Sequence, residues 1–334
     1  MLWPSIKKQN YMNFKNFTSP SLLIETSPGI AKYFKKYGIF IALLFICIIL
    51  TIATPNFLTI QNMVMVLRQT SINGILAIGV TFVIISGGID LSLGSVVALT
   101  GVAAASFAHP GTHGLIVPLL VGILIGLGIG VVNGLIITKG KVAAFIVTLG
   151  MMTIARGLAL VVSDGRPISN LSDSFNFIGG GEFLNIPIPI LLFGGVIVLS
   201  SIILNYTKTG RYIYAVGGNE NAAKASGINV HSIKMFTYII CSGLAGLAGI
   251  VLASRITTGQ PNAGVAYELD AIAAVVIGGT SLSGGSGKII GTVVGALIIG
   301  VINNGLDLLN ITSYSQQIIK GLIIIGAVLL DRKN

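Results

Sequence analysis

The string GGTSLSGGSGK, residues 278–288, is the part of this chain that comes nearest to a phosphate-binding loop. A nucleotide-binding loop reads Gly, four residues, Gly-Lys and then Ser or Thr, because backbone amides surround the phosphates and the hydroxyl holds Mg²⁺. Leu282 stands where the first glycine is required, and Ile289 follows Lys288 where the hydroxyl is required. We therefore expect no ATPase site, no catalytic residue and no bound cofactor in this chain.

The histidines and cysteines indicate no metal centre. His109, His113 and His231 have no acidic or cysteine partners at ligand spacing. Cys47 and Cys241 both fall within long apolar runs, so each is interpreted as a small apolar side chain rather than half of a disulfide.

Asp90 is the one good candidate for an ion-coupling carboxylate, since coupled carriers use buried acids as relays. It lies in the turn SGGIDLS, where a short side chain could equally cap the following helix by accepting backbone N–H groups. Capping is the favoured interpretation. We assign this turn a structural or gating role through Gly87, Gly88, Asp90, Leu91 and Ser92.

The remaining polar residues within the apolar runs are mostly neutral amides and hydroxyls. Such groups suit an uncharged solute such as a sugar, although bonds between helices are their more frequent role. The candidates for lining a pore are Gln69, Asn73, Asn303 and Asn304.

A small-residue, charge-bearing island, GRYIYAVGGNENAAKASGINV at 210–230, interrupts the apolar sequence. Charged residues gathered in this way indicate a segment outside the lipid, and its small residues leave room for another protein to approach. We interpret it as a docking segment within a loop at about 207–232. Its candidate residues are Gly210, Arg211, Gly217, Gly218, Asn219, Glu220, Ala222, Ala223 and Gly227.

The elements that must position these residues are membrane helices. The chain has 334 residues, of which 53% are hydrophobic, only 9% are charged and 44 are glycine. Soluble domains are about one quarter charged, whereas glycine-rich apolar chains are typical of polytopic α-helical membrane proteins. The apolar segments are continuous rather than alternating, which argues against a β-barrel.

A membrane span needs about 20 mostly apolar residues. That criterion predicts ten spans, with eight as the alternative, and the third and eighth are short enough to be re-entrant or broken. The ten lie near 38–54, 63–86, 93–108, 115–138, 142–162, 188–206, 233–253, 267–282, 289–305 and 314–330. The first is expected to be a retained helix rather than a cleaved signal, within a transmembrane domain at 37–331 that follows a cytoplasmic extension at 1–36.

The net charge of +10 is explained by membrane topology rather than by nucleic acid. With the N-terminus inside, 15 of the 20 Lys and Arg residues fall on the cytoplasmic side, as the positive-inside rule requires. Both termini are therefore expected to be cytoplasmic.

Glycine recurs in two kinds of pattern, one that predicts close helix packing and one that suggests an internal repeat. Gly122, Gly126, Gly130 and Gly134 recur every four residues, a spacing that lets helix backbones touch; packing is favoured over a role in substrate binding. A second series runs Gly287, Gly291, Gly295. The strings GGIDLSLGS at 87–95 and GGTSLSGGS at 278–286 share six of nine positions, which suggests an internal repeat.

From about Pro55 to the C-terminus, the chain resembles the permease subunits of bacterial ABC importers for monosaccharides. The specific strings are PNFLTIQN, SGGIDLSLGSVVALTG, GRYIYAVGGNENAAKASGIN, YELDAIAAVVIGGTSLSGG and IIGVINNGLDLLNITSYSQQIIKG. The first 35 or so residues depart from the pattern and leave the start, Met1 or Met12, open.

The resemblance implies an inner-membrane protein that works as a homodimer with a second permease copy. It also implies an ABC ATPase subunit that binds ATP and Mg²⁺, a periplasmic sugar-binding protein, and ribose as the favoured cargo. The island at 210–230 matches the family's ATPase-coupling loop. A self-sufficient secondary carrier or channel is the alternative, and a membrane enzyme is disfavoured because no acid/base or metal constellation is present.

Overall fold

The computed structural model describes residues 28–331, and almost all of them lie in or between α-helices. The chain divides after Gly38 into two units, and the packing described below belongs to the second, which starts at Ile39. Most of the predicted extension at 1–36, and the ends of both termini, lie outside the described residues.

The helices follow one another with short connections and a single β-hairpin. Their bounds are α1 Pro28–Ala53, α2 Ile60–Ile85, α3 Leu93–Ser106, α4 Ile116–Thr138, α5 Ala144–Val162, α6 Asp173–Gly180, β1 Glu182–Phe183, β2 Ile186–Pro187, α7 Ile188–Tyr206, α8 Lys208–Gly218, α9 Glu220–Ala225, α10 Val230–Arg255, α11 Tyr267–Ile277, α12 Ile289–Leu308 and α13 Ser313–Asp331.

A helix occupies each of the ten apolar segments that the sequence indicates. Within residues 28–331, six helices are long and apolar enough to cross a membrane: α2, α4, α5, α7, α10 and α12. The third and eighth segments are short, as expected, with 14 residues in α3 and 11 in α11. The polytopic helical fold is thereby established, whereas the count of ten spans stays a prediction.

Side-chain caps and glycines fix where several helices begin and end. The Thr59 hydroxyl accepts the Asn62 amide at the start of α2, and the Asn229 side chain accepts the Ser232 amide at the start of α10. Such bonds satisfy amides that a helix cannot satisfy internally. Gly87, just after α2, has φ +79°, a left-handed conformation that glycine adopts without steric cost.

α10 is the central helix of the second unit and packs mainly against α4, α3 and α2. The glycine row of α4 faces it: a Cβ at Gly126 would lie 2.6 Å from the Ser242 carbonyl oxygen, and one at Gly130 would lie 2.6 Å from the Ile239 Cα. Only helices without side chains at these positions can approach so closely. In the second glycine series, Gly291 and Gly295 meet the backbone of Gly278 and Ala274, so α12 packs on α11 in the same way.

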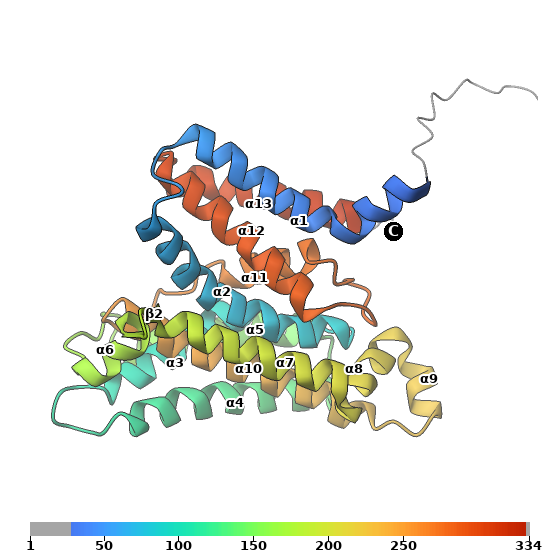
Figure 1. The fold of residues 1–334 in the computed structure, drawn as a ribbon. Coiled ribbons are helices and arrows are strands. Elements are labelled where there is room, and N and C mark those ends of the chain that lie inside the picture. The colour runs from blue at the N-terminus through green and yellow to red at the C-terminus, as the bar shows by residue number, and fades with distance from the viewer. Residues whose placement is uncertain (1–27, 332–334) are drawn as a thin grey trace, which may run out of the picture. The chain divides into compact units, whose positions relative to one another are not determined.

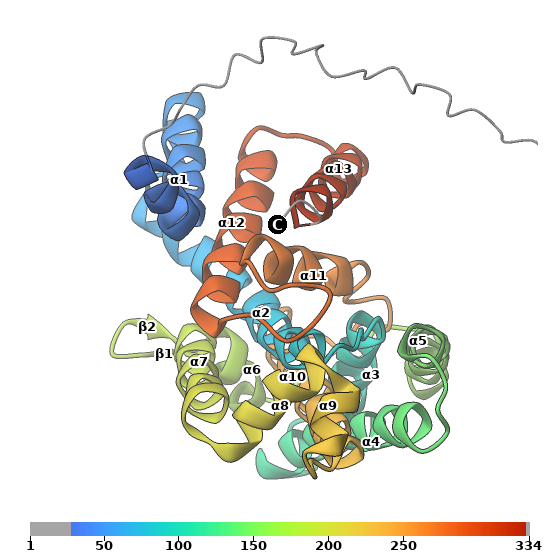
Figure 2. The same cartoon turned by 90° about the vertical axis from the view of Figure 1, so that its right-hand side faces the viewer.

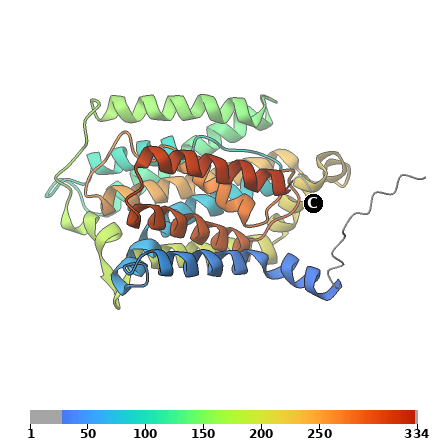
Figure 3. The same cartoon turned by 90° about the horizontal axis from the view of Figure 1, so that it is seen from above.

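The long helices run side by side (Figure 3), and the connections gather at their two ends. Figure 1 shows α8 and α9 at one end and α6 with the β-hairpin at the other. Figure 2 views the end where α8 and α9 lie in front of the bundle. The segment singled out at 210–230 therefore projects from the same end as the α4–α5 and α11–α12 connections.

Candidate functional site

The segment between α7 and α10 folds into two short helices joined by one residue. Thr207 begins α8 by accepting the Gly210 amide at 3.1 Å. Asn219 ends α8 and begins α9, where its side chain accepts the Ala222 amide at 3.0 Å. Gly227, at φ +81°, then turns the chain back toward α10. A connection with this many caps holds a defined shape outside the apolar helices.

The candidate docking residues divide between two faces of this segment. Those exposed to the outside are Arg211, Gly218, Asn219, Glu220, Ala222 and Gly227. Gly210 and Ala223 are buried, and Ala223 retains only 4% of its accessible surface. The expectation that Ala223 leaves room for a partner is therefore corrected: its methyl group packs inward, and Ala222 holds the outer position.

An ion pair holds α9 to α10. The Lys234 ammonium donates to the Glu220 carboxylate at 2.5 Å. Glu220 is half exposed, so the pair contributes modestly to stability.

The C-terminal end of α8 contacts two other connections through glycine backbones. A Cβ on Gly217 would overlap the Ile85 carbonyl oxygen and lie 2.7 Å from the Gly285 amide nitrogen. A Cβ on Gly284 would lie 2.8 Å from the Gly217 carbonyl oxygen and 3.1 Å from the Gly87 Cα. We call this meeting point of Ile85–Gly87, Gly217–Gly218 and Gly284–Gly285 the glycine junction.

Two hydrogen bonds complete the glycine junction. The Gly285 amide donates to the Ile85 carbonyl at 2.9 Å, which joins the end of α2 to the α11–α12 loop. The Tyr214 hydroxyl of α8 donates to the Gly287 carbonyl at 2.8 Å. At the glycine junction the backbones of α8, of the end of α2 and of the loop before α12 are thus in direct contact.

The turn at 87–92 is closed by Asp90, which is fully buried. Its Oδ1 accepts the Ser92 amide at 2.9 Å and the Ser92 hydroxyl at 2.6 Å, and Asn133 of α4 donates to that hydroxyl at 3.3 Å. Asp90 does accept a backbone N–H, yet Ser92 is itself the residue that precedes α3. The bond therefore closes the turn rather than capping the first turn of the helix.

Burial raises the pKa of the Asp90 carboxyl above its ordinary value, and the bonds from Ser92 oppose that rise. Desolvation disfavours the charged form of a carboxyl group. Among residues 28–331, no basic side chain forms an ion pair with it.

The four proposed pore-lining residues have different surroundings. Asn304 exchanges two hydrogen bonds with Asn62 of α2, at 2.9 and 2.7 Å, so its amide joins two helices. Asn303 donates to Asp270 at 3.5 Å. Gln69 is half-buried and Asn73 is buried, and neither side chain has a hydrogen-bond partner within the described chain. For Asn304 the structure thus shows a contact between two helices, and a pore-lining role for the four residues stays a prediction.

Charged residues inside the bundle have local hydrogen-bond or ion-pair partners. Lys320 of α13 pairs with Asp270 of α11 at 2.9 Å. Arg156 of α5 instead donates to the Pro261 and Ala263 carbonyls, at 2.6 and 2.8 Å. A loop before α11 and the helix α13 are held in place by these contacts.

Comparison with known proteins decides the family. The model of a family described as branched-chain amino acid transport system / permease component matches residues 62–328. The chain belongs to this permease family. With its apolar membrane-length helices, this permease is a multi-pass transport subunit of the bacterial inner membrane.

The permease is similar over nearly its whole length to named sugar permeases. It is 50% identical to the ribose import permease protein of Haemophilus influenzae, covering 90% of this chain and 94% of that protein. It is 49% identical to the ribose import permease protein of Bacillus subtilis, with coverage of 90% and 94%. Identity to the L-arabinose transport system permease protein of Escherichia coli is 39%, with coverage of 94% and 96%. No solved structure matches the chain.

Sequence reasoning missed the partners in these contacts. Nothing in the spacing of Asn62 and Asn304, or of Tyr214 and Gly287, links residues so far apart in the chain. Gly-Gly pairs at 87–88, 217–218 and 284–285 meet in the structure, but the sequence holds further Gly-Gly pairs, at 179–181, 194–195 and 278–279, so the pattern alone could not select these three.

Proposed function

We propose that this permease forms the membrane pore of an ATP-driven importer for monosaccharides, with ribose as its cargo. The similarity to the ribose permeases is about ten percentage points higher than to the arabinose permease, and this difference supports ribose. All ten apolar helices cross or enter the membrane, and both termini are cytoplasmic.

A second copy of the permease completes the pore. An ABC ATPase, which binds ATP and Mg²⁺, docks on α8 and α9, and a periplasmic sugar-binding protein docks at the opposite end, near α6 and the β-hairpin. The outer position of Ala222 and Arg211 and the short, well-capped α8–α9 unit support the docking site.

The glycine junction supports a mechanism by which the ATPase drives transport. When the ATPase moves α8, the backbone contacts at Gly217 carry that movement to Ile85 and to Gly285. α2 ends at Ile85, Gly285 lies in the loop that leads into α12, and the two helices pack against each other, so their tilt changes together. Coupling of this kind is a free energy shared between two sites, typically about 1–3 kcal/mol.

Two experiments test the proposal. Cells that lack this chain are expected to lose uptake of labelled ribose and to regain it from a plasmid copy, with unlabelled ribose competing more strongly than arabinose or allose. Uptake of ribose that does not depend on the chain would contradict the assignment of cargo.

The docking site is tested by Ala222→Trp, which adds bulk to the outer face of α9. We expect the ATPase to co-purify poorly with this variant while membrane insertion is normal. Thr112→Trp, at an exposed position of the α3–α4 loop, serves as the control and is expected to leave co-purification unchanged.

A further inference from the structure

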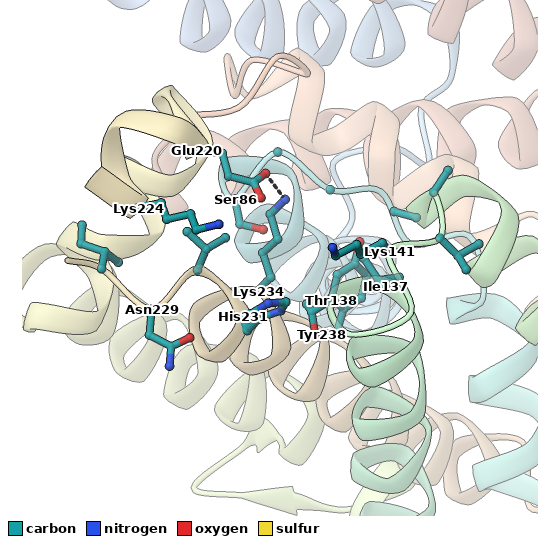
Figure 4. A pocket seen from close by; sticks show the side chains of 17 residues that line it. Ser86, Ile137, Thr138, Lys141, Glu220, Lys224, Asn229, His231, Lys234 and Tyr238 are labelled. Carbon is teal, nitrogen blue, oxygen red and sulfur yellow. Dashed lines mark hydrogen bonds and ion pairs between the residues drawn. The ribbon is translucent and has the colours of Figure 1, made fainter. Parts of the chain in front are cut away.

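A cavity of about 640 Å³ opens at the end of the bundle that carries α8 and α9. Its walls come from four places: the end of α2, the α4–α5 connection, α9, and the first turns of α10 (Figure 4). The volume is in the range of small-molecule binding sites. No role assigned above uses this space.

The charge of the cavity is basic and largely uncompensated. Lys141, Lys224, Lys234 and His231 line it, with Glu220 as the single acidic side chain. Glu220 is already paired with Lys234 at 2.5 Å. Within residues 28–331, the ammonium groups of Lys141 and Lys224 have neither an ion pair nor a hydrogen bond.

The two unpaired lysines reach the cavity from opposite walls. Figure 4 shows Lys224 entering from α9 and Lys141 from the α4–α5 connection, with Lys234 and His231 between them. Like charges held around an empty space repel one another and create a local positive potential. An anion placed between the lysines would remove that repulsion.

The first turn of α10 adds backbone donors. Val230 and His231 line the cavity, and their amides have no acceptor in the described part of the chain. The Asn229 side chain satisfies the Ser232 amide instead. The N-terminus of this 26-residue helix therefore presents free N–H groups and the positive end of its dipole to the cavity.

The rest of the wall is mostly apolar. Tyr238, Ile228 and Val142 form one part of it, while the Ser86 and Thr138 hydroxyls already donate to backbone carbonyls. A bare anion would leave most of this surface uncovered. A phosphate group attached to a small organic body would fill the cavity and place its charge among the lysines.

We propose that this cavity binds the phosphate group of a phosphate ester, taken either from a soluble cytoplasmic metabolite or from the headgroup of an anionic phospholipid. A bound phosphate would join Lys224 on α9 to Lys141 on the α4–α5 connection and so restrain α9 relative to that connection. The proposal that a phosphate ester binds is argued from the cavity alone. An effect of that binding on transport depends on the proposed coupling role of α8 and α9.

The test uses the full-length permease purified in a non-ionic detergent. Its thermal unfolding midpoint is measured against increasing glycerol 3-phosphate, with sodium chloride at matched ionic strength as the reference. A second series adds phosphatidylglycerol, with phosphatidylcholine as the reference lipid. We expect a saturable rise in the midpoint for at least one phosphate ester and none for the references.

The variants assign the binding to this cavity. Lys141 has φ +55°, so Lys141→Asn removes its charge with a residue that tolerates left-handed backbone. Lys141→Asn and Lys224→Gln are each expected to raise the half-saturating concentration about tenfold, the loss of one charge-assisted hydrogen bond. Lys139→Gln removes a neighbouring exposed lysine that does not line the cavity, and we expect it to bind as the parent does.

Each outcome has a defined meaning. Saturation by glycerol 3-phosphate identifies a soluble ligand, and saturation by phosphatidylglycerol alone identifies a lipid headgroup; either supports the proposal if the two cavity variants weaken it. No saturable shift, or an equal shift in Lys139→Gln and the cavity variants, would overturn it. Since the purified permease is tested without an ATPase or sugar, a failure of the proposed transport function would leave this result unchanged.

Discussion

The glycine junction and the polar contacts inside the bundle hold helices together in opposite ways. At the glycine junction, backbones of three connections touch because Gly217, Gly284 and Gly285 have no side chains. Between α2 and α12, and between α11 and α13, side chains reach across: Asn62 to Asn304, and Lys320 to Asp270. A polar pair can tilt and re-form as helices shift, whereas a backbone contact transmits a displacement directly.

The first prediction breaks the glycine junction itself. In Gly217→Ala the new methyl group overlaps the Ile85 carbonyl oxygen, so the end of α2 or the 284–285 loop must move. Overpacking of this kind destabilises by about 1–3 kcal/mol. Thermal unfolding of the purified protein measures it, with Gly128→Ala, where the added methyl group meets no atom within 4 Å, as the control.

The second prediction breaks the ion pair of the bundle. Lys320→Met leaves the Asp270 carboxylate, which is 5% exposed, without its partner. A buried charge left unpaired is costly, but Lys320 is about a quarter exposed, so water can reach the site and the loss should be about 1–2 kcal/mol. Pairing the change with Asp270→Asn should recover part of the loss in the same unfolding measurement; no recovery would show that the two residues act independently.

The third prediction concerns the amide pair. Asn304→Leu removes two hydrogen bonds and leaves Asn62 with its bond to the Phe57 carbonyl. Hydrogen bonds between membrane helices average about 0.6 kcal/mol, so we expect a loss of about 1 kcal/mol. Ribose transport should persist when it is measured at a temperature low enough for the variant to stay folded. Complete loss of transport in a folded Asn304→Leu protein would instead indicate that Asn304 lines the pore.

The smallest effect is expected at Asp90. Asp90→Asn keeps an oxygen that accepts both Ser92 bonds, and burial disfavours the charged form of the carboxyl group, which raises its pKa. Uptake and stability should therefore be close to those of the parent. Loss of transport with normal assembly would instead require a charge at this turn.

Much of the helical framework follows from the sequence. Long apolar segments and charge placement locate helices at all ten indicated positions, because lipid forces backbone groups to be satisfied within each segment. The four-residue glycine row of α4 likewise indicates a close helix neighbour. The spacing could not say that this neighbour is α10.

The site was only partly predictable, for a physical reason. The sequence singles out 210–230 because charged and small residues stand out in an apolar chain. Which side of α9 faces the bundle depends on tertiary packing, and so the burial of Ala223 was missed. The basic cavity brings together Lys141 and Lys224, which no local pattern relates, since contacts across 83 positions leave no periodic signal.

The central claim is that the glycine junction transmits movement of α8 to α2 and α12. The most direct measurement records ATP hydrolysis and ribose uptake together in proteoliposomes that contain the partner ATPase and binding protein, for Gly217→Ala and Gly128→Ala. We predict that Gly217→Ala keeps hydrolysis but loses most uptake, while Gly128→Ala keeps both. Uptake by Gly217→Ala equal to that of Gly128→Ala would contradict the account.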